Sequence, residues 1–194
     1  MTTTVRKLNL IAHVVSSEGW LGAVLAFLAL SIAGLRSTDA ATVRAVYLSM
    51  NLTGEFVIVP LSFLALVTGL VLALGTEWGL FWYYWVLIKF ALTTGATALL
   101  LLHQFTAVAE AARLVSVGPA IDDRLGTLGI QLIVDASLAI VVLVIATALS
   151  IVKPGGKIVW RRATAKIWIF AVGLILAMVV LRHVVGGGMR HHGH

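Results

Sequence analysis

The chain of 194 residues has no cysteine, only three prolines and few charged residues. The absence of cysteine excludes disulfides, thiolate metal sites and iron–sulfur clusters. Charged residues make up 11% of the chain, whereas a soluble domain carries about 25%. Hydrophobic residues make up 60%, and the mean hydropathy is +1.05. Because a water-facing surface cannot be built from this composition, the sequence predicts an integral membrane protein.

The basic residues outnumber the acidic ones by 14 to 8, which leaves a formal net charge of +6. They lie mainly at the ends of apolar runs and in one connecting segment, as cytoplasmic charge does in membrane proteins. We therefore expect the lipid bilayer, and no nucleic acid, as the partner of this charge. A phosphate-binding glycine loop, an HExxH motif and a serine elbow are all absent from the sequence, so the motifs leave open whether the protein is an enzyme.

Five segments contain the roughly 20 mainly apolar residues that a helix needs to cross a bilayer. All are predicted to be helical, because lipid offers no partner to an unpaired backbone group. The fold class is therefore all-α: a single-domain polytopic transmembrane bundle with four core helices and a fifth beside them. The five predicted spans are residues 8–35, 43–74, 81–105, 128–152 and 167–185, followed by a flexible His-rich tail at 186–194.

The connections predict the topology. The short polar segment Arg36–Ala41 indicates that the first two helices are antiparallel. The third helix is expected to continue through Ala107–Val115 and to end at Gly118 and Pro119. The loop 153–166 carries five basic residues, which favours its placement in the cytoplasm and the C-terminus outside. We expect a multi-pass protein of the inner (plasma) membrane.

Ionisable residues inside the predicted spans are costly to bury, so each is a functional hypothesis. Lys89 lies at about the depth of Glu18, and the sequence predicts that it pairs with Glu18 or Glu55. Helical spacing places His13, Ser17 and Trp20 on one face of the first helix. Each of the first four spans presents one polar stripe, and the simplest arrangement turns all four inward. The predicted intramembrane polar cluster comprises Glu18, Asn51, Glu55 and Asp135, together with Lys89. The alternative is that these residues only fix helix packing.

The histidines suggest ligand roles of differing kinds. His103 and His183 lie at matching depths near the ends of their spans, which suits two axial ligands of one haem. His13 lies near the other surface and would need a partner ligand other than histidine or act as a single ligand. Imidazole and thioether ligands suit copper, so a tail metal site is a further hypothesis, with a solvated chain end as the alternative. The tail residues in question are His191, His192 and His194, with Met189 beside them.

Two stretches carry a family pattern over about the first 105 residues. One is His13-Val-Val-Ser-Ser-Glu-Gly19-Trp20-Leu-Gly22, and the other is Trp85-Val-Leu-Ile-Lys89-Phe-Ala-Leu, with Leu-Leu-Leu-His103 further along. The pattern resembles bacterial membrane proteins related to copper-resistance protein D and neighbouring uncharacterised small membrane families. It is more distantly similar to the membrane-bound, haem-associated protoporphyrinogen oxidase. The resemblance implies haem b as a cofactor, with His13 and Lys89 as the positions that carry it.

Three functions stay open from the sequence. The first is a redox or electron-transfer protein whose polar cluster holds haem b or a quinone. The second is a transporter of protons or of metal ions such as copper, with Glu18, Glu55, Lys89 and Asp135 lining the path. The third is a non-catalytic subunit that assembles with other membrane proteins or with copies of itself.

Overall fold

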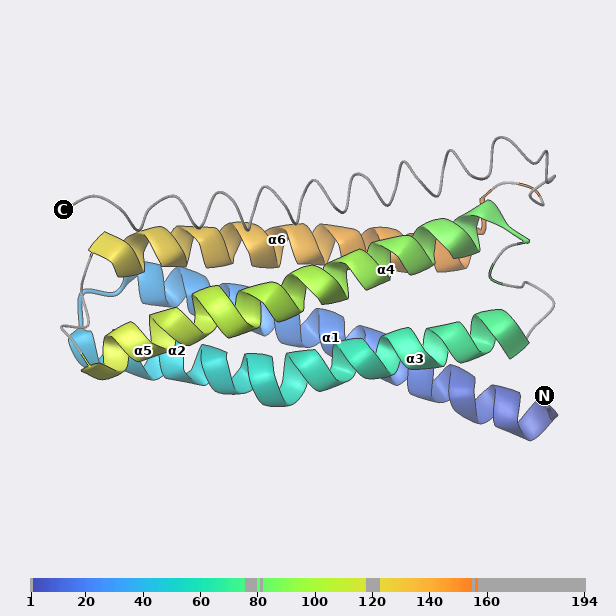
Figure 1. Cartoon of the computed structure of the whole chain (residues 1–194), viewed down its shortest axis with the longest axis horizontal. Helices are drawn as coiled ribbons and strands as arrows, with labels where there is room; N and C mark the ends of the chain where they lie inside the picture. Colours follow the sequence, from blue (N-terminus) through green and yellow to red (C-terminus); the bar gives the residue numbers. More distant parts are fainter. Residues whose placement is uncertain (1, 76–79, 81, 118–122, 155, 157–194) are drawn as a thin grey trace. The chain divides into compact units, whose positions relative to one another are not determined.

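The computed structural model describes residues 2–75, 80, 82–117, 123–154 and 156. In this part of the chain every regular element is a helix, which confirms the predicted all-α class (Figure 1). Two of the elements, η1 and η2, are short π-helical segments within longer helices. The elements are α1 (Thr3–Arg36), α2 (Ala40–Thr53), η1 (Gly54–Ile58), α3 (Val59–Gly75), α4 (Tyr84–His103), η2 (Gln104–Val108), α5 (Ala109–Val117) and α6 (Asp123–Val152).

Four long helices result, because η1 joins α2 to α3 and η2 joins α4 to α5. They span Thr3–Arg36, Ala40–Gly75, Tyr84–Val117 and Asp123–Val152, and each is long and apolar enough to cross a membrane. The first four predicted spans therefore exist as helices, and each helix extends beyond the predicted span at one or both ends. The third begins at Tyr84 rather than at residue 81 and continues to Val117, as the sequence indicated. The predicted fifth span and the tail lie outside the described residues.

The turn between the first two helices is short and well capped. The carboxylate of Asp39 accepts a hydrogen bond from the Thr42 backbone N–H at 2.9 Å, which satisfies one of the unpaired donors at the start of α2. The Thr42 hydroxyl also donates to this carboxylate. These hydrogen bonds, from the hydroxyl and from the backbone N–H of Thr42, hold the pKa of Asp39 below its ordinary value of 3.8. Only residues 37–39 separate α1 from α2, so the predicted antiparallel connection is confirmed.

The helices are arranged as a ring of four. α1 packs against α2, α3 and α6, whereas α4 packs against α3 and α6. Among the described elements no backbone contact joins α1 to α4, so these two helices face each other across the bundle. Figure 1 shows the four long helices side by side, with the start of α1, the end of α3 and the start of α4 at one end. The chain thus runs up and down in turn through the bundle.

The interior and the exterior of the bundle differ sharply. Trp20, Tyr47, Met50 and Leu132 are almost fully buried in one continuous core. Large apolar side chains are nevertheless exposed along all four long helices, and Phe56 and Phe105 are each 68% exposed. An apolar exterior of this extent is not expected on a monomer surrounded by water.

The two π-helical segments meet in the bundle, and a glycine makes their approach possible. The side-chain amide of Gln104 in η2 donates to the backbone oxygen and to Oδ1 of Asn51, both at 3.2 Å. A Cβ atom on Gly54 in η1 would collide with this amide. A residue with a side chain at position 54 would therefore push Gln104 away from Asn51.

Candidate functional site

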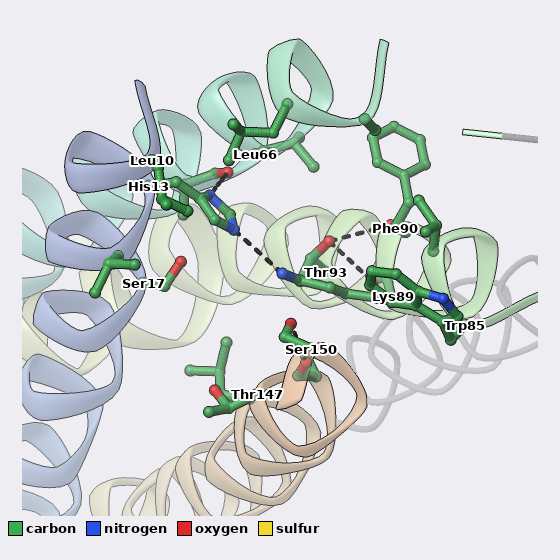
Figure 2. Close-up of a pocket in the computed structure, with 18 of the residues that line it drawn as sticks. Leu10, His13, Ser17, Leu66, Trp85, Lys89, Phe90, Thr93, Thr147 and Ser150 are labelled. Carbon is green, nitrogen blue, oxygen red and sulfur yellow. Dashed lines mark hydrogen bonds between the residues drawn. The ribbon is translucent and has the colours of Figure 1, made fainter. Parts of the chain in front are cut away.

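A cavity of about 550 Å³ lies among α1, α3, α4 and α6 (Figure 2). Its volume falls within the roughly 300–1,000 Å³ of small-molecule sites, and like them it has mainly apolar walls with a few converging polar groups. Aromatic rings of Trp20, Trp85 and Phe90 form part of the wall. The polar and charged lining residues are Arg6, His13, Ser17, Glu18, Lys89, Thr93, Thr147, Ser150 and Lys153.

His13 is held in one orientation by α3. Its Nδ1 lies 3.0 Å from the backbone oxygen of Ala65 and 3.1 Å from the hydroxyl oxygen of Thr68. Because a carbonyl oxygen can only accept, Nδ1 must carry the hydrogen and donate it. The Thr68 hydroxyl itself donates to the backbone oxygen of Leu64 at 2.6 Å. In the neutral ring, Nε2 therefore presents a lone pair on the side away from α3.

Lys89 reaches across the bundle to that lone pair. Its Nζ lies 3.2 Å from Nε2 of His13, and Figure 2 shows the two side chains pointing toward one another from α4 and α1. A hydrogen bond forms when the Lys89 amine donates to this lone pair. An ammonium group has three N–H donors, so one bond to His13 leaves donors for a ligand.

The structure corrects the predicted partner of Lys89, because no ion pair joins it to Glu18 or Glu55. Both glutamates are exposed residues, and Glu18 lines the cavity without forming an ion pair with Lys89. Glu18 lies five residues after His13, and at 3.6 residues per turn this places it well around α1 from the His13 face. The sequence predicted similar depths for Lys89 and Glu18, but depth alone does not determine which face of a helix meets a partner.

A glycine of α3 lets the imidazole lie against the helix backbone. An added Cβ at Gly69 would lie 2.9 Å from Cε1 of His13, closer than ordinary contact allows. One turn before His13, the side-chain amide of Asn9 donates to the backbone oxygen of Thr68 at 3.0 Å. These contacts join α1 to α3 and determine where the imidazole lies in the cavity.

The predicted inward cluster is not one cluster. Asn51 meets Gln104, as described above, and the neighbouring His103 lies with Nδ1 3.0 Å from Oδ2 of Asp135 on α6. We call Asn51, His103, Gln104 and Asp135 the packed polar layer. It is separate from the cavity, because His103 follows Lys89 by 14 residues, about 21 Å along a helix.

In the described part of the chain, the other predicted ligand residues do not come together at one site. His103 is buried against Asp135 and does not line the cavity. Its predicted partner His183 and the tail residues His191, His192 and His194 lie outside the described part of the chain. Within that part, no group of three His, Asp or Glu side chains is placed to hold a metal ion.

The sequence prediction missed several residues around the cavity. His13, Ser17 and Trp20 do line it together, as their spacing indicated. Thr68 and Gly69 were not singled out, although a polar residue and a glycine side by side in an apolar run are an indication of close packing. Thr147 and Ser150, three residues apart on α6, were also missed. Their side chains lie near each other in Figure 2.

No protein-family model, curated protein or solved structure matches this chain. The resemblance to copper-resistance protein D therefore stays a prediction. The function has to be inferred from the geometry of the cavity.

Proposed function

We propose that this chain is an integral membrane protein that binds a quinone in the cavity at His13 and Lys89. The observation that carries the proposal is the pairing of Lys89 Nζ with His13 Nε2 at 3.2 Å inside a cavity of about 550 Å³. A quinone is a flat apolar ring with oxygen acceptors. Lys89 supplies the hydrogen-bond donors for such an oxygen, and the rings of Trp85 and Phe90 supply apolar walls.

The membrane part of the proposal is supported by the length and exterior of the helices. The shortest of the four has 30 residues, or about 45 Å at 1.5 Å per residue, against about 30 Å of hydrocarbon. Apolar side chains exposed on all four would face lipid. Arg6 and Lys153 line the cavity at the end of the bundle that leads into the basic loop 153–166. With that loop in the cytoplasm, the cavity lies near the inner surface of the plasma membrane.

Haem b, which the sequence resemblance implies, fits the described residues less well. The bond from His13 Nδ1 to a backbone oxygen is the support that metal-ligating histidines usually have. Lys89, however, occupies the lone pair of Nε2, which an iron atom would need. The other described histidine, His103, lies against Asp135 instead. A haem would therefore require the Lys89 side chain to turn away from His13.

The hydrogen-bonded pair of Lys89 and His13 is also suited to the proton transfers of quinone chemistry. A bound quinone supplies two-electron, two-proton chemistry. The Nζ and Nε2 atoms share one proton at the point where a ring oxygen would bind, so this chain can hold a proton beside the ligand. Proton or copper transport has less support, because the polar residues fall into two separate groups rather than one continuous path.

Tryptophan fluorescence offers a direct test, since Trp20 and Trp85 line the cavity. The full-length protein in detergent is titrated with a short-chain benzoquinone, and saturable quenching is expected. Lys89→Met removes a charged donor, so the affinity is expected to fall by about 10- to 100-fold. Lys7→Met is the matched control, because Lys7 is exposed and does not line the cavity.

Two results would contradict the proposal. One is the absence of saturable quenching in the wild-type protein. The other is a Soret absorption band of the purified protein that disappears in His13→Ala but persists in Lys89→Met. That second result would identify His13 as a haem ligand and would replace the quinone with haem b.

A further inference from the structure

Two hydroxyl groups that line the cavity make no hydrogen bond within the described part of the protein. Hydroxyls within helices usually donate to a backbone oxygen of the preceding turn. The Thr93 hydroxyl donates in this way to the backbone oxygen of Lys89 at 3.0 Å, and the Ser150 hydroxyl donates to that of Ala146 at 2.9 Å. Ser17 of α1 and Thr147 of α6 line the same cavity and make no such bond. Both side chains are only partly buried, so their hydroxyls remain open to a ligand.

A third donor is more deeply buried. The side chain of Trp20 lines the cavity and is only 1% exposed, and its Nε1 has no hydrogen-bond partner. The great majority of buried polar groups in proteins are hydrogen-bonded, because an unpaired one loses its bonds to water without replacement. An indole N–H can only donate. Only a hydrogen-bond acceptor would therefore satisfy it.

The three donors belong to neighbouring positions. Ser17 and Trp20 are three residues apart and share one face of α1. Thr147 comes from α6, which packs directly against α1. Ser17 follows His13 by four residues, about 6 Å along the helix axis. This separation resembles the span of a six-membered ring that carries an oxygen at each end.

We propose that Ser17, Trp20 and Thr147 form a second oxygen-binding subsite, which holds one carbonyl of a para-quinone while Lys89 holds the other. The inference rests on the proposed function and adds a requirement to it. The ligand must carry two oxygen acceptors on opposite sides of a ring. The subsite would select such rings over rings that carry a single carbonyl.

Two probes separate the subsite from the Lys89 end of the cavity. One is 1,4-naphthoquinone, and the other is 1-tetralone, a related bicyclic ketone with a single carbonyl. Both are titrated into the full-length protein and into the double variant Ser17→Ala/Thr147→Val. The naphthoquinone affinity is expected to fall about tenfold in the variant, as for the loss of two neutral hydrogen bonds. The tetralone affinity is expected to stay unchanged, because Lys89 alone holds its carbonyl.

The controls keep folding and binding apart. Ser137→Ala removes an α6 hydroxyl that donates to the backbone oxygen of Ile133 and does not line the cavity, so it should leave both affinities unchanged. A second double variant, Ser17→Ala/Thr147→Ser, keeps the hydroxyl that Ser17→Ala/Thr147→Val lacks at position 147. It should recover part of the naphthoquinone affinity. Trp20→Phe keeps an aromatic ring but loses the N–H, and should weaken naphthoquinone binding alone.

The outcomes separate the subsite from the wider proposal. Naphthoquinone binding to the wild type that is unchanged in the double variant would overturn the subsite and leave the quinone site at Lys89 intact. An equal loss for both probes would also overturn it, because the effect would then not depend on the second carbonyl. Failure of the wild type to bind either probe would overturn the proposed function, and the subsite with it.

Discussion

The bundle contains two polar regions of similar composition and opposite character. In the cavity, Lys89 and His13 bond to each other and still leave donors that face about 550 Å³ of space. In the packed polar layer, the side chains of His103 and Gln104 are 5% and 3% exposed and are engaged with neighbouring helices. Similar residue types therefore serve helix packing in one place and favour ligand binding in the other. The difference lies in whether the polar side chains face a neighbouring helix or an open cavity.

Helix geometry explains part of this contrast. A π-helical segment inserts one extra residue into the helical repeat and alters which side chains face a neighbour. η1 and η2 meet at Gly54, where the absence of a Cβ lets the Gln104 amide approach Asn51. His13 and Lys89 lie in the α-helical stretches α1 and α4, outside both π-helical segments. The comparison predicts that substitutions in the packed polar layer affect stability, whereas those in the cavity affect binding.

The largest stability effect is expected from Asp135→Ala. Removing one member of a buried pair leaves the other without its partner, which costs about 3 kcal/mol. The affinity for the quinone should stay unchanged, because Asp135 does not line the cavity. Thermal and denaturant unfolding in detergent measure the loss. The double variant with His103→Ala should be more stable than the sum of the single losses predicts, and strict additivity would contradict a coupled pair.

A smaller loss, of about 2 kcal/mol, is expected from Gly54→Ala. The new methyl group would displace the Gln104 amide from Asn51, and overpacking of this kind typically costs 1–3 kcal/mol. Gly22→Ala is the control, because an added Cβ there meets nothing within 4 Å. Because alanine has a higher helix propensity than glycine, Gly22→Ala should leave the free energy of unfolding unchanged or raise it by up to about 1 kcal/mol. Equal effects of the two substitutions would show that the contact at Gly54 is not tight.

In the cavity, Gly69→Ala should affect ligand binding more than stability, the reverse of what is expected for Gly54→Ala. Its Cβ would press on Cε1 of His13 and tilt the ring away from Lys89. We expect a change in stability below about 1 kcal/mol and a loss of quinone affinity of roughly fivefold, the equivalent of about 1 kcal/mol. Gly126→Ala on α6, where an added Cβ also has open space, is the control. A stability loss as large as that of Gly54→Ala, with binding intact, would reverse the comparison.

The smallest effect concerns Asp39, which lies outside both polar regions. Because its pKa in the folded protein is below 3.8, its ionised form is stabilised by folding. This stabilisation is fully present above pH 3.8 and is lost as the pH falls through the lowered folded-state pKa. Thermal unfolding of wild type and Asp39→Asn is compared between pH 6 and pH 3. The wild type should lose more stability than the variant, which keeps a capping side chain but no titrating group. Parallel curves would refute a role for the Asp39 charge.

Much of the architecture could be predicted from the sequence for simple physical reasons. Long apolar runs between polar turns determine the four long helices, because a chain in lipid must satisfy its backbone bonds within each helix. The short connection at residues 37–39 determines that α1 and α2 are antiparallel. The shared face of His13, Ser17 and Trp20 follows from 3.6 residues per turn. Each of these features depends on one helix or one turn at a time.

The partners of the polar residues were decided only by the tertiary structure. Lys89 could be placed within its helix, but its meeting with His13 rather than Glu18 depends on which helices face each other across the ring. The π-helical segments likewise reflect contacts between helices, because the bond from Gln104 to Asn51 joins residues 53 positions apart. Spacing along one helix determines which residues share a face. Only the packing of several helices decides whether that face meets lipid, another polar side chain or a cavity.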